Sequence, residues 1–184
     1  MSSELAKRLE RADKALAKGK PDLALEEYLA VLREDPKNDK LREAAADLCA
    51  TLNRPADAAT LLSPLFDRLA SIGDNPRAVI TFKKIARMGT PTLEQWYRYG
   101  QLVERSSRRE SLEAYETALT GLAQAGRAQE AYPVLQRIVA LEPTERNYQR
   151  EGELARELGD NKAAAAAFFE VGRASCRERV SKQV

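Results

Sequence analysis

Three arginines and three serines share the stretch RSSRRES, residues 105–111, and such side chains can grip a phosphate or a nucleic acid. The alternative is a helix junction, in which Ser106 or Ser107 caps the helix that follows. We favour the cap, because the basic cluster is very local. Trp96 and Tyr99 could stack on a ligand, but their i, i+3 spacing beside Gly100 indicates helix packing instead.

Other reactive side chains are scarce. The chain has no histidine, which is the commonest general base and metal ligand. Its two cysteines, Cys49 and Cys176, make neither a disulfide framework nor a zinc site. We interpret Cys49, in an apolar helical setting, as a buried structural residue. With no phosphate loop, carboxylate pair or activated nucleophile to assign, we expect a protein that is not an enzyme and needs no cofactor.

The charge distribution bears on nucleic-acid binding. The formal net charge is +2, with a surplus of +4 in residues 73–111 and a deficit of −4 in residues 112–171. A nucleic-acid binder normally carries a large basic surplus that displaces counterions from phosphates. Nucleic-acid binding through the basic 77–109 region is therefore the least favoured of our hypotheses.

The chain has no stretch suited to a bilayer. Its longest run without a charged residue is Thr117–Gly126, ten residues, whereas a membrane-spanning helix needs about 20. The first twenty residues alternate charges with apolar positions and lack a signal-peptide core. We expect a cytoplasmic protein of 184 residues with no membrane contact.

One pattern recurs along the chain: a glycine, an alanine five residues later, a larger apolar residue four later, and a branched residue three later. Positions four and three apart lie on one face of a helix, where the alanine lets a neighbouring helix approach closely. The glycine permits a left-handed turn between two helices. The pattern occurs in five frames: Gly19, Ala24, Tyr28, Val31; Ala58, Leu62, Leu65; Gly73, Ala78, Phe82, Ile85; Gly126, Ala131, Leu135, Ile138; Gly159, Ala164, Phe168, Val171.

A second set of anchors precedes two of these frames. Trp96 and Gly100 stand one turn apart, as do Tyr148 and Gly152, so each helix offers a bulky knob and a notch to its neighbour. Together these anchors resemble the tetratricopeptide repeat (TPR), a helix–turn–helix unit of about 34 residues. The resemblance covers roughly residues 5–171 and implies an all-α, right-handed superhelix, or α-solenoid.

The repeat pattern predicts about ten antiparallel helices in a domain over residues 1–171. Pairing is ambiguous between residues 56 and 124, because Ala58 and Ala78 are only 20 residues apart. The expected units are 5–38, 39–72, a degenerate 73–111, 112–144 and 145–171. The expected helices are 3–18, 21–34, 38–52, 55–72, 75–88, 92–105, 108–124, 127–141, 145–158 and 161–171.

Residues 172–184 do not continue the apolar pattern, so we expect the last helix to end near residue 171. The string GRASCRERV in this basic tail resembles a translated sequencing-adapter read-through. That interpretation makes the tail non-native or a truncation junction. The alternative is a frayed basic tail.

The TPR resemblance also implies where a partner binds, since partners of this family usually lie along the first helices of the repeats. Treating the helices led by Trp96 and Tyr148 as first helices yields two sets of candidate partner-binding residues. They are Tyr97, Arg98, Gln101 and Arg105, and Gln149, Arg150 and Glu153.

The resemblance favours a non-catalytic interaction scaffold of bacterial type, whose groove holds a partner peptide or helix. The alternative is a regulatory or targeting arm of a larger enzyme or signalling protein.

Overall fold

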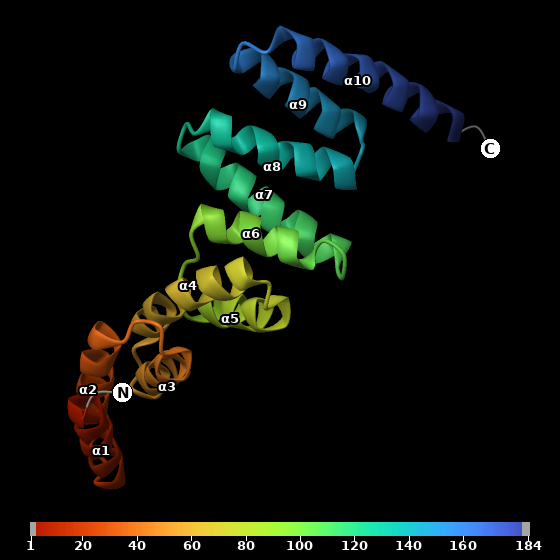
Figure 1. Ribbon diagram of the computed structural model, residues 1–184. Coiled ribbons are helices and arrows are strands. Elements are labelled where there is room, and N and C mark those ends of the chain that lie inside the picture. Colours follow the sequence, from red (N-terminus) through yellow and green to blue (C-terminus); the bar gives the residue numbers. More distant parts are fainter. Residues whose placement is uncertain (1–2, 182–184) are drawn as a thin grey trace. The chain divides into compact units, whose positions relative to one another are not determined.

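The computed structural model describes residues 3–181, and the side chains of residues 4–174. Within that part the chain is helical and contains no strand, which confirms the all-α prediction (Figure 1). The helices are α1 (Ser3–Ala17), α2 (Pro21–Glu34), α3 (Asp39–Thr51), α4 (Pro55–Ile72), α5 (Asn75–Met88), α6 (Leu93–Val103), α7 (Arg108–Gln124), α8 (Ala128–Leu141), α9 (Glu145–Glu157) and α10 (Asn161–Ser181).

The helix bounds match the prediction closely until the last helix. We expected α10 to end near residue 171, and this is wrong, because the helix continues to Ser181. The apolar stripe stops near residue 171, but the helix does not stop with it. Alanine, arginine and glutamate are good helix formers, so a helix can continue where its apolar face stops. Residues 182–184 lie outside the described part of the chain, as do the side chains beyond Ala174, Cys176 among them.

The chain divides into two compact units, Met1–Pro91 with α1–α5 and Thr92–Val184 with α6–α10. Within each unit, every helix packs against its neighbours in the chain. The boundaries of the individual repeats, and the handedness of a superhelix, stay predictions. No helix among residues 3–181 is both long enough and apolar enough to cross a membrane.

In the first unit, α4 packs against both α3 and α5. Ala58, Leu65 and Phe66 of α4 are buried, and the ring of Phe66 contacts that of Phe82 in α5 at 5.4 Å between centroids. Arg77 at the start of α5 donates to Glu43 of α3 at 2.9 Å, so α3 and α5 lie side by side. From the sequence, α4 could pair with either α3 or α5, and in the structure it packs against both.

In the second unit, glycines let neighbouring helices touch. A Cβ atom at Gly100 of α6 would lie 2.5 Å from the ring of Tyr115 in α7. At Gly152 of α9 it would lie 2.7 Å from the ring of Phe168 in α10. Real Cβ atoms do not come so close, so both glycines are the notches that the sequence predicted. Tyr115 is fully buried and belongs to the core that α7 and α8 form between them.

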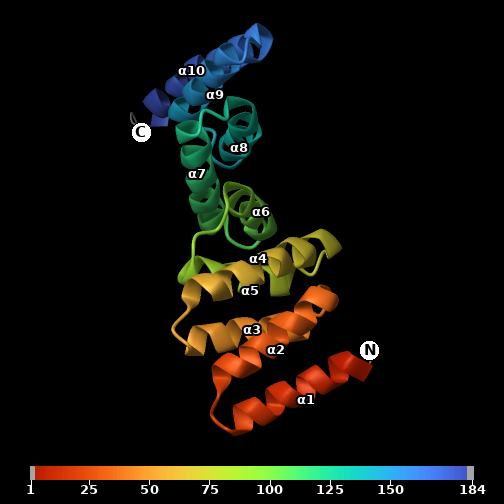
Figure 2. The same ribbon diagram turned by 90° about the vertical axis from the view of Figure 1, so that its left-hand side faces the viewer.

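Ion pairs define two layers in this unit. Arg127, the N-cap of α8, donates to Glu94 of α6 at 2.6 Å, and Arg137 of α8 lies 3.7 Å from Glu104 at the end of α6. Arg150 of α9 donates to Glu116 of α7 at 2.7 Å. Helices α6 and α8 therefore share one layer, and α7 and α9 share the other. Figure 2 shows α6 and α8 on the same side of α7.

Residues in the left-handed backbone conformation form the turns of several helix hairpins. Gly126, with φ of 68°, lies between α7 and α8, and its conformation would strain most residues with a Cβ atom, asparagine being the common exception. Asn53, with φ of 59°, takes the same role between α3 and α4. It is 34 residues after Gly19, so it fills the turn position for which the second frame has no glycine.

Candidate partner-binding site

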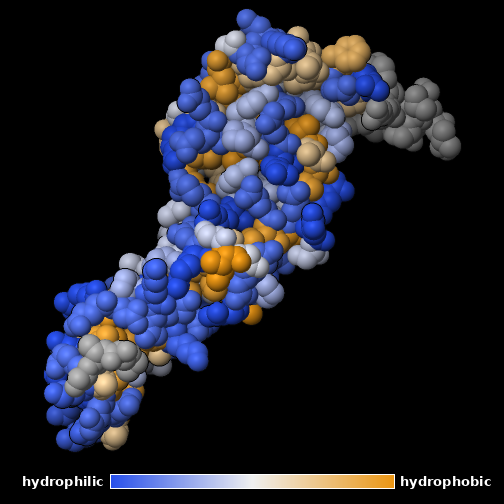
Figure 3. Space-filling model, in the orientation of Figure 1, coloured by the Kyte–Doolittle hydropathy of each residue, from blue (hydrophilic) through white to orange (hydrophobic). Residues whose placement is uncertain are grey.

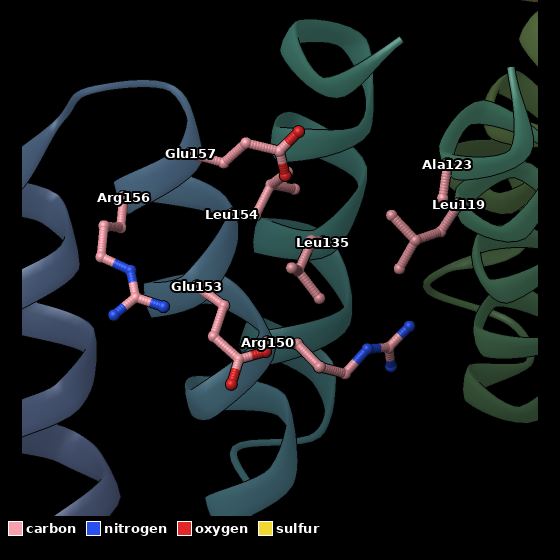
Figure 4. A pocket seen from close by; sticks show the side chains of 8 residues that line it. All are labelled: Leu119, Ala123, Leu135, Arg150, Glu153, Leu154, Arg156 and Glu157. Carbon is pink, nitrogen blue, oxygen red and sulfur yellow. The ribbon is translucent and has the colours of Figure 1, made fainter. Parts of the chain in front are cut away.

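A groove of about 580 Å³ opens between α7 and α9, over α8. Its apolar floor comes from Leu119 of α7, Leu135 of α8 and Leu154 of α9, while Ala123 leaves room at the side. Figure 4 shows the leucines between the two helices and Arg150 reaching toward α7. We call this the α7–α9 groove; its charged lining residues are Arg150, Glu153, Arg156 and Glu157.

The sequence of α9 gives this helix one face that lines the groove and another that packs against α10. Thr144 caps it by accepting from the backbone N–H of Asn147 at 3.3 Å. Residues 150, 153, 154 and 157 then follow at i, i+3, i+4 and i+7, so they share one face and line the groove. Gly152 lies on another face and packs against α10. The helix can therefore hold its neighbour and still present charged side chains to a partner.

Arg150 joins the two walls of the groove. Its guanidinium donates to both carboxylate oxygens of Glu116 at 2.7 and 2.9 Å, and to the side-chain oxygen of Asn147 at 3.3 Å. Both partners of the pair are half-buried. The hydrogen bond lowers the pKa of Glu116 and raises that of Arg150, so both stay charged near neutral pH. The ion pair fixes the width of the groove at this end.

The other charged residues of the rim are more open. Gln149 donates to Glu153 at 3.0 Å across one turn of α9. Arg156 and Glu157, at the other end, have side chains that make no hydrogen bond or ion pair within the described part of the chain. Both charges are available to a partner.

The α6 residues of the prediction lie elsewhere. Tyr97 is half-buried, with its ring 5.7 Å from that of Tyr115, and it lines a second cavity of about 270 Å³ between α6 and α8. Arg98, Gln101 and Arg105 belong to the lining of neither cavity. We call the second space the α6–α8 cavity; its lining is Leu93, Glu94, Tyr97, Leu122, Gln129, Glu130, Pro133 and Val134.

The structure therefore separates the two predicted sets. We expected the helices led by Trp96 and Tyr148 to face one groove, but α6 belongs to the layer of α8 and α9 to that of α7. A bulky residue beside a glycine indicates a tight helix contact, and it does not specify the layer. Gln149, Arg150 and Glu153 are brought together, whereas the α6 set lies apart from them.

The stretch RSSRRES is a helix junction. Ser107 caps α7 by accepting from the backbone N–H of Glu110 at 3.3 Å, which confirms the capping interpretation. Arg109 pairs with Glu113 one turn later at 2.9 Å. The stretch thus starts α7.

Core packing also accounts for Tyr99 and Cys49. Tyr99 is 5% exposed and donates its hydroxyl to Glu110 at 2.5 Å, while Trp96 contacts its ring edge-on at 6.5 Å between centroids. Burial raises the pKa of Tyr99. Cys49 is 1% exposed and burial raises the pKa of its thiol, as expected for a structural cysteine. These side chains stabilise the fold and are not free for a ligand.

Sequence reasoning missed the floor of the α7–α9 groove and the role of Glu116. One signal was present. Glu116 and Arg150 are 34 residues apart, as are Glu43 and Arg77, and this is the length of one repeat. Opposite charges at the repeat spacing would have placed α7 beside α9.

Comparison with known proteins gives distant likenesses. No family model matches this chain, and no curated protein matches it. A crystal structure of MamA is 17% identical, with 91% of this chain and 96% of that chain covered and a TM-score of 0.33. TTC0263, a TPR protein of Thermus thermophilus, is 18% identical with 97% of each chain covered and a TM-score of 0.34. A TPR protein from Parabacteroides merdae is 15% identical, covering 94% and 80%, with a TM-score of 0.31.

Proposed function

We propose that this protein is a non-catalytic interaction scaffold, and that the α7–α9 groove binds a peptide or helix from a partner protein. The groove itself carries the proposal: about 580 Å³ of space with a leucine floor and charges of both signs around it. Figure 3 shows one face of the molecule, on which apolar patches are scattered among mostly polar side chains. Gln149, Arg150 and Glu153 are its proposed contact residues.

The groove can supply both affinity and direction. Each leucine-sized side chain that a partner buries on this floor contributes about 1.5–3 kcal/mol before ordering costs. Arg156 and Glu157 favour one orientation of a partner that carries opposite charges. The Arg150–Glu116 ion pair holds the walls in place before binding, so less free energy is lost in ordering the site.

The decisive experiment selects peptides that bind the purified chain from a random display library and measures their affinity by fluorescence anisotropy. Ala123→Trp fills the groove from α7, where Ala123 is exposed, and should weaken the selected peptides at least tenfold. Ala140→Trp adds the same bulk at an exposed position of α8 outside the groove and should leave them unchanged. If the selected peptides bind both variants as tightly as they bind the wild-type chain, the groove is not their binding site.

Nucleic-acid binding through residues 77–109 is less well supported. Arg77 pairs with Glu43 at 2.9 Å, Lys84 with Asp47 at 3.2 Å and Arg109 with Glu113 at 2.9 Å. Basic side chains already paired with carboxylates displace fewer counterions from phosphates. We expect affinity for single-stranded RNA or DNA to stay weak at low salt.

The α6 residues remain candidate contacts of a different kind. Tyr97 borders the α6–α8 cavity, while Arg98, Gln101 and Arg105 lie on other parts of the same helix and the loop after it. They do not belong to the α7–α9 groove. A partner that uses them binds the other layer of the second unit.

A further inference from the structure

The α6–α8 cavity has the walls of a pocket for one flat side chain. Leu93, Leu122 and Val134 make it apolar, and the ring of Tyr97 forms one side. Its volume of about 270 Å³ leaves room for a bicyclic ring such as indole.

A proline in the wall of this pocket deprives one backbone carbonyl of α8 of its helical hydrogen bond. Pro133 stands inside α8 and has no backbone N–H, so the carbonyl of Gln129 lacks its usual partner four residues on. Gln129 and Pro133 both line the pocket, one helical turn apart. A helical carbonyl deprived of its N–H favours a ligand that donates a single hydrogen bond.

Two carboxylates, Glu94 and Glu130, line the same pocket, and an arginine bridges them. Arg127 donates to Glu94 at 2.6 Å and to Glu130 at 2.7 and 2.6 Å, which ties α6 to the start of α8. These hydrogen bonds lower the pKa of both carboxyl groups, so they stay ionised at neutral pH. The group carries a net charge of −1, which favours a basic residue beside the ligand.

We propose that the α6–α8 cavity binds the tryptophan side chain of a partner protein, with a lysine or arginine as its neighbour in that partner. Indole offers one N–H donor and no acceptor, which complements a pocket with a free carbonyl. Its ring packs against Tyr97 in the offset or edge-to-face geometry that aromatic pairs prefer. Tyrosine is smaller and its oxygen also needs a donor, while phenylalanine leaves the carbonyl unpaired. The site lies on the α6 and α8 layer, so it does not depend on the α7–α9 groove.

The test titrates small peptides into the full chain, labelled at leucine and valine methyl groups, and follows their NMR shifts. The probes are Ac-Trp-Lys-NH2, Ac-Trp-Glu-NH2, and the Lys peptide with benzothienylalanine, in which sulfur replaces the indole N–H. We expect shifts at Leu93, Leu122 and Val134, about fivefold weaker binding without the N–H, and about threefold weaker binding of the Glu peptide.

Pro133→Ala isolates the hydrogen bond. Alanine restores the backbone N–H that pairs with the Gln129 carbonyl and removes a helix breaker, so the variant should fold well. The fivefold preference for indole over its sulfur analogue should then fall to about one. Pro64→Ala makes the same change inside α4 of the first unit and should keep the preference.

Several results would overturn the proposal. One is the absence of methyl shifts up to the solubility of the peptides. Another is a set of shifts at Leu119, Leu135 and Leu154, which would place the peptides in the α7–α9 groove instead. Equal affinity of the wild-type chain for the indole and sulfur peptides would remove the role of the carbonyl, and with it the argument for tryptophan.

Discussion

At Glu116 and Arg150, one ion pair both shapes the α7–α9 groove and contributes to stability. Each side chain is half-buried, and two N–H groups of the guanidinium meet two oxygens of the carboxylate. Such a bidentate arrangement holds two helices more specifically than an exposed pair does. Replacing either partner should therefore alter the groove as well as the fold.

Glu116→Gln should lower the free energy of unfolding by about 1 kcal/mol at pH 7. Arg150 holds the pKa of Glu116 below its ordinary value of 4.5, so the stabilisation is present above that pH. It is lost as the pH falls through the lowered pKa, where the folded protein also takes up the proton. Urea unfolding at pH 7 and in steps below pH 4.5 should show wild type and variant converging toward acid.

Glu113→Gln is the matched control for this prediction. Glu113 pairs with Arg109 on the same helix, but their side chains are 62% and 89% exposed. Its loss should cost no more than about 0.5 kcal/mol at pH 7. If both variants lose the same stability, the pair between α7 and α9 has no special value.

At the scale of the elements, contact between helices depends on two glycines. Gly100→Ala and Gly152→Ala would drive a methyl group into the rings of Tyr115 and Phe168, and each should cost about 1–3 kcal/mol. Gly100→Ala should cost more than Gly152→Ala, since Tyr115 is fully buried while Phe168 is 38% exposed and can move. Thermal or urea unfolding of both variants checks the order.

Gly172→Ala supplies the opposite expectation. Nothing lies within 4 Å of a Cβ atom built at this position inside α10. Alanine should therefore stabilise the helix by up to about 1 kcal/mol through its higher propensity. A loss of stability here would mean that the helix packs against something at this residue.

Sequence periodicity predicted the elements well and their layers badly. The spacing of Ala131, Leu135 and Ile138 predicted α8 and its buried face, because burial on one side of a helix repeats every three to four residues. The Trp96–Gly100 motif did not reveal which layer α6 joins, since any closely packed helix needs such a notch. The floor of the groove was invisible for a similar reason: Leu119 and Leu135 look like ordinary core residues until their neighbours leave a gap.

At the scale of the whole molecule, each compact unit has a core of its own. The first buries Leu62, Leu65 and Phe66 among its helices, and the second buries Tyr115 and Ile138. Arrays of this kind are stabilised by contacts between successive helices, so a segment with several helices can fold alone.

The fragment of residues 92–184 should therefore fold alone and retain the α7–α9 groove. We expect a helical circular-dichroism spectrum, a cooperative thermal transition, and unchanged affinity for peptides selected on the full chain. The fragment of residues 1–91 should also fold, yet it should not bind those peptides. If the fragment of residues 92–184 were unfolded, its core would depend on the first five helices.

The ion pairs between alternate helices also bear on how such a chain can evolve. Glu43 with Arg77 and Glu116 with Arg150 each join residues one repeat length apart. Duplicating or deleting a segment of that length would put an equivalent helix in each partner's place. The lineage of this chain can therefore lengthen or shorten by whole repeats while keeping the contacts between alternate helices.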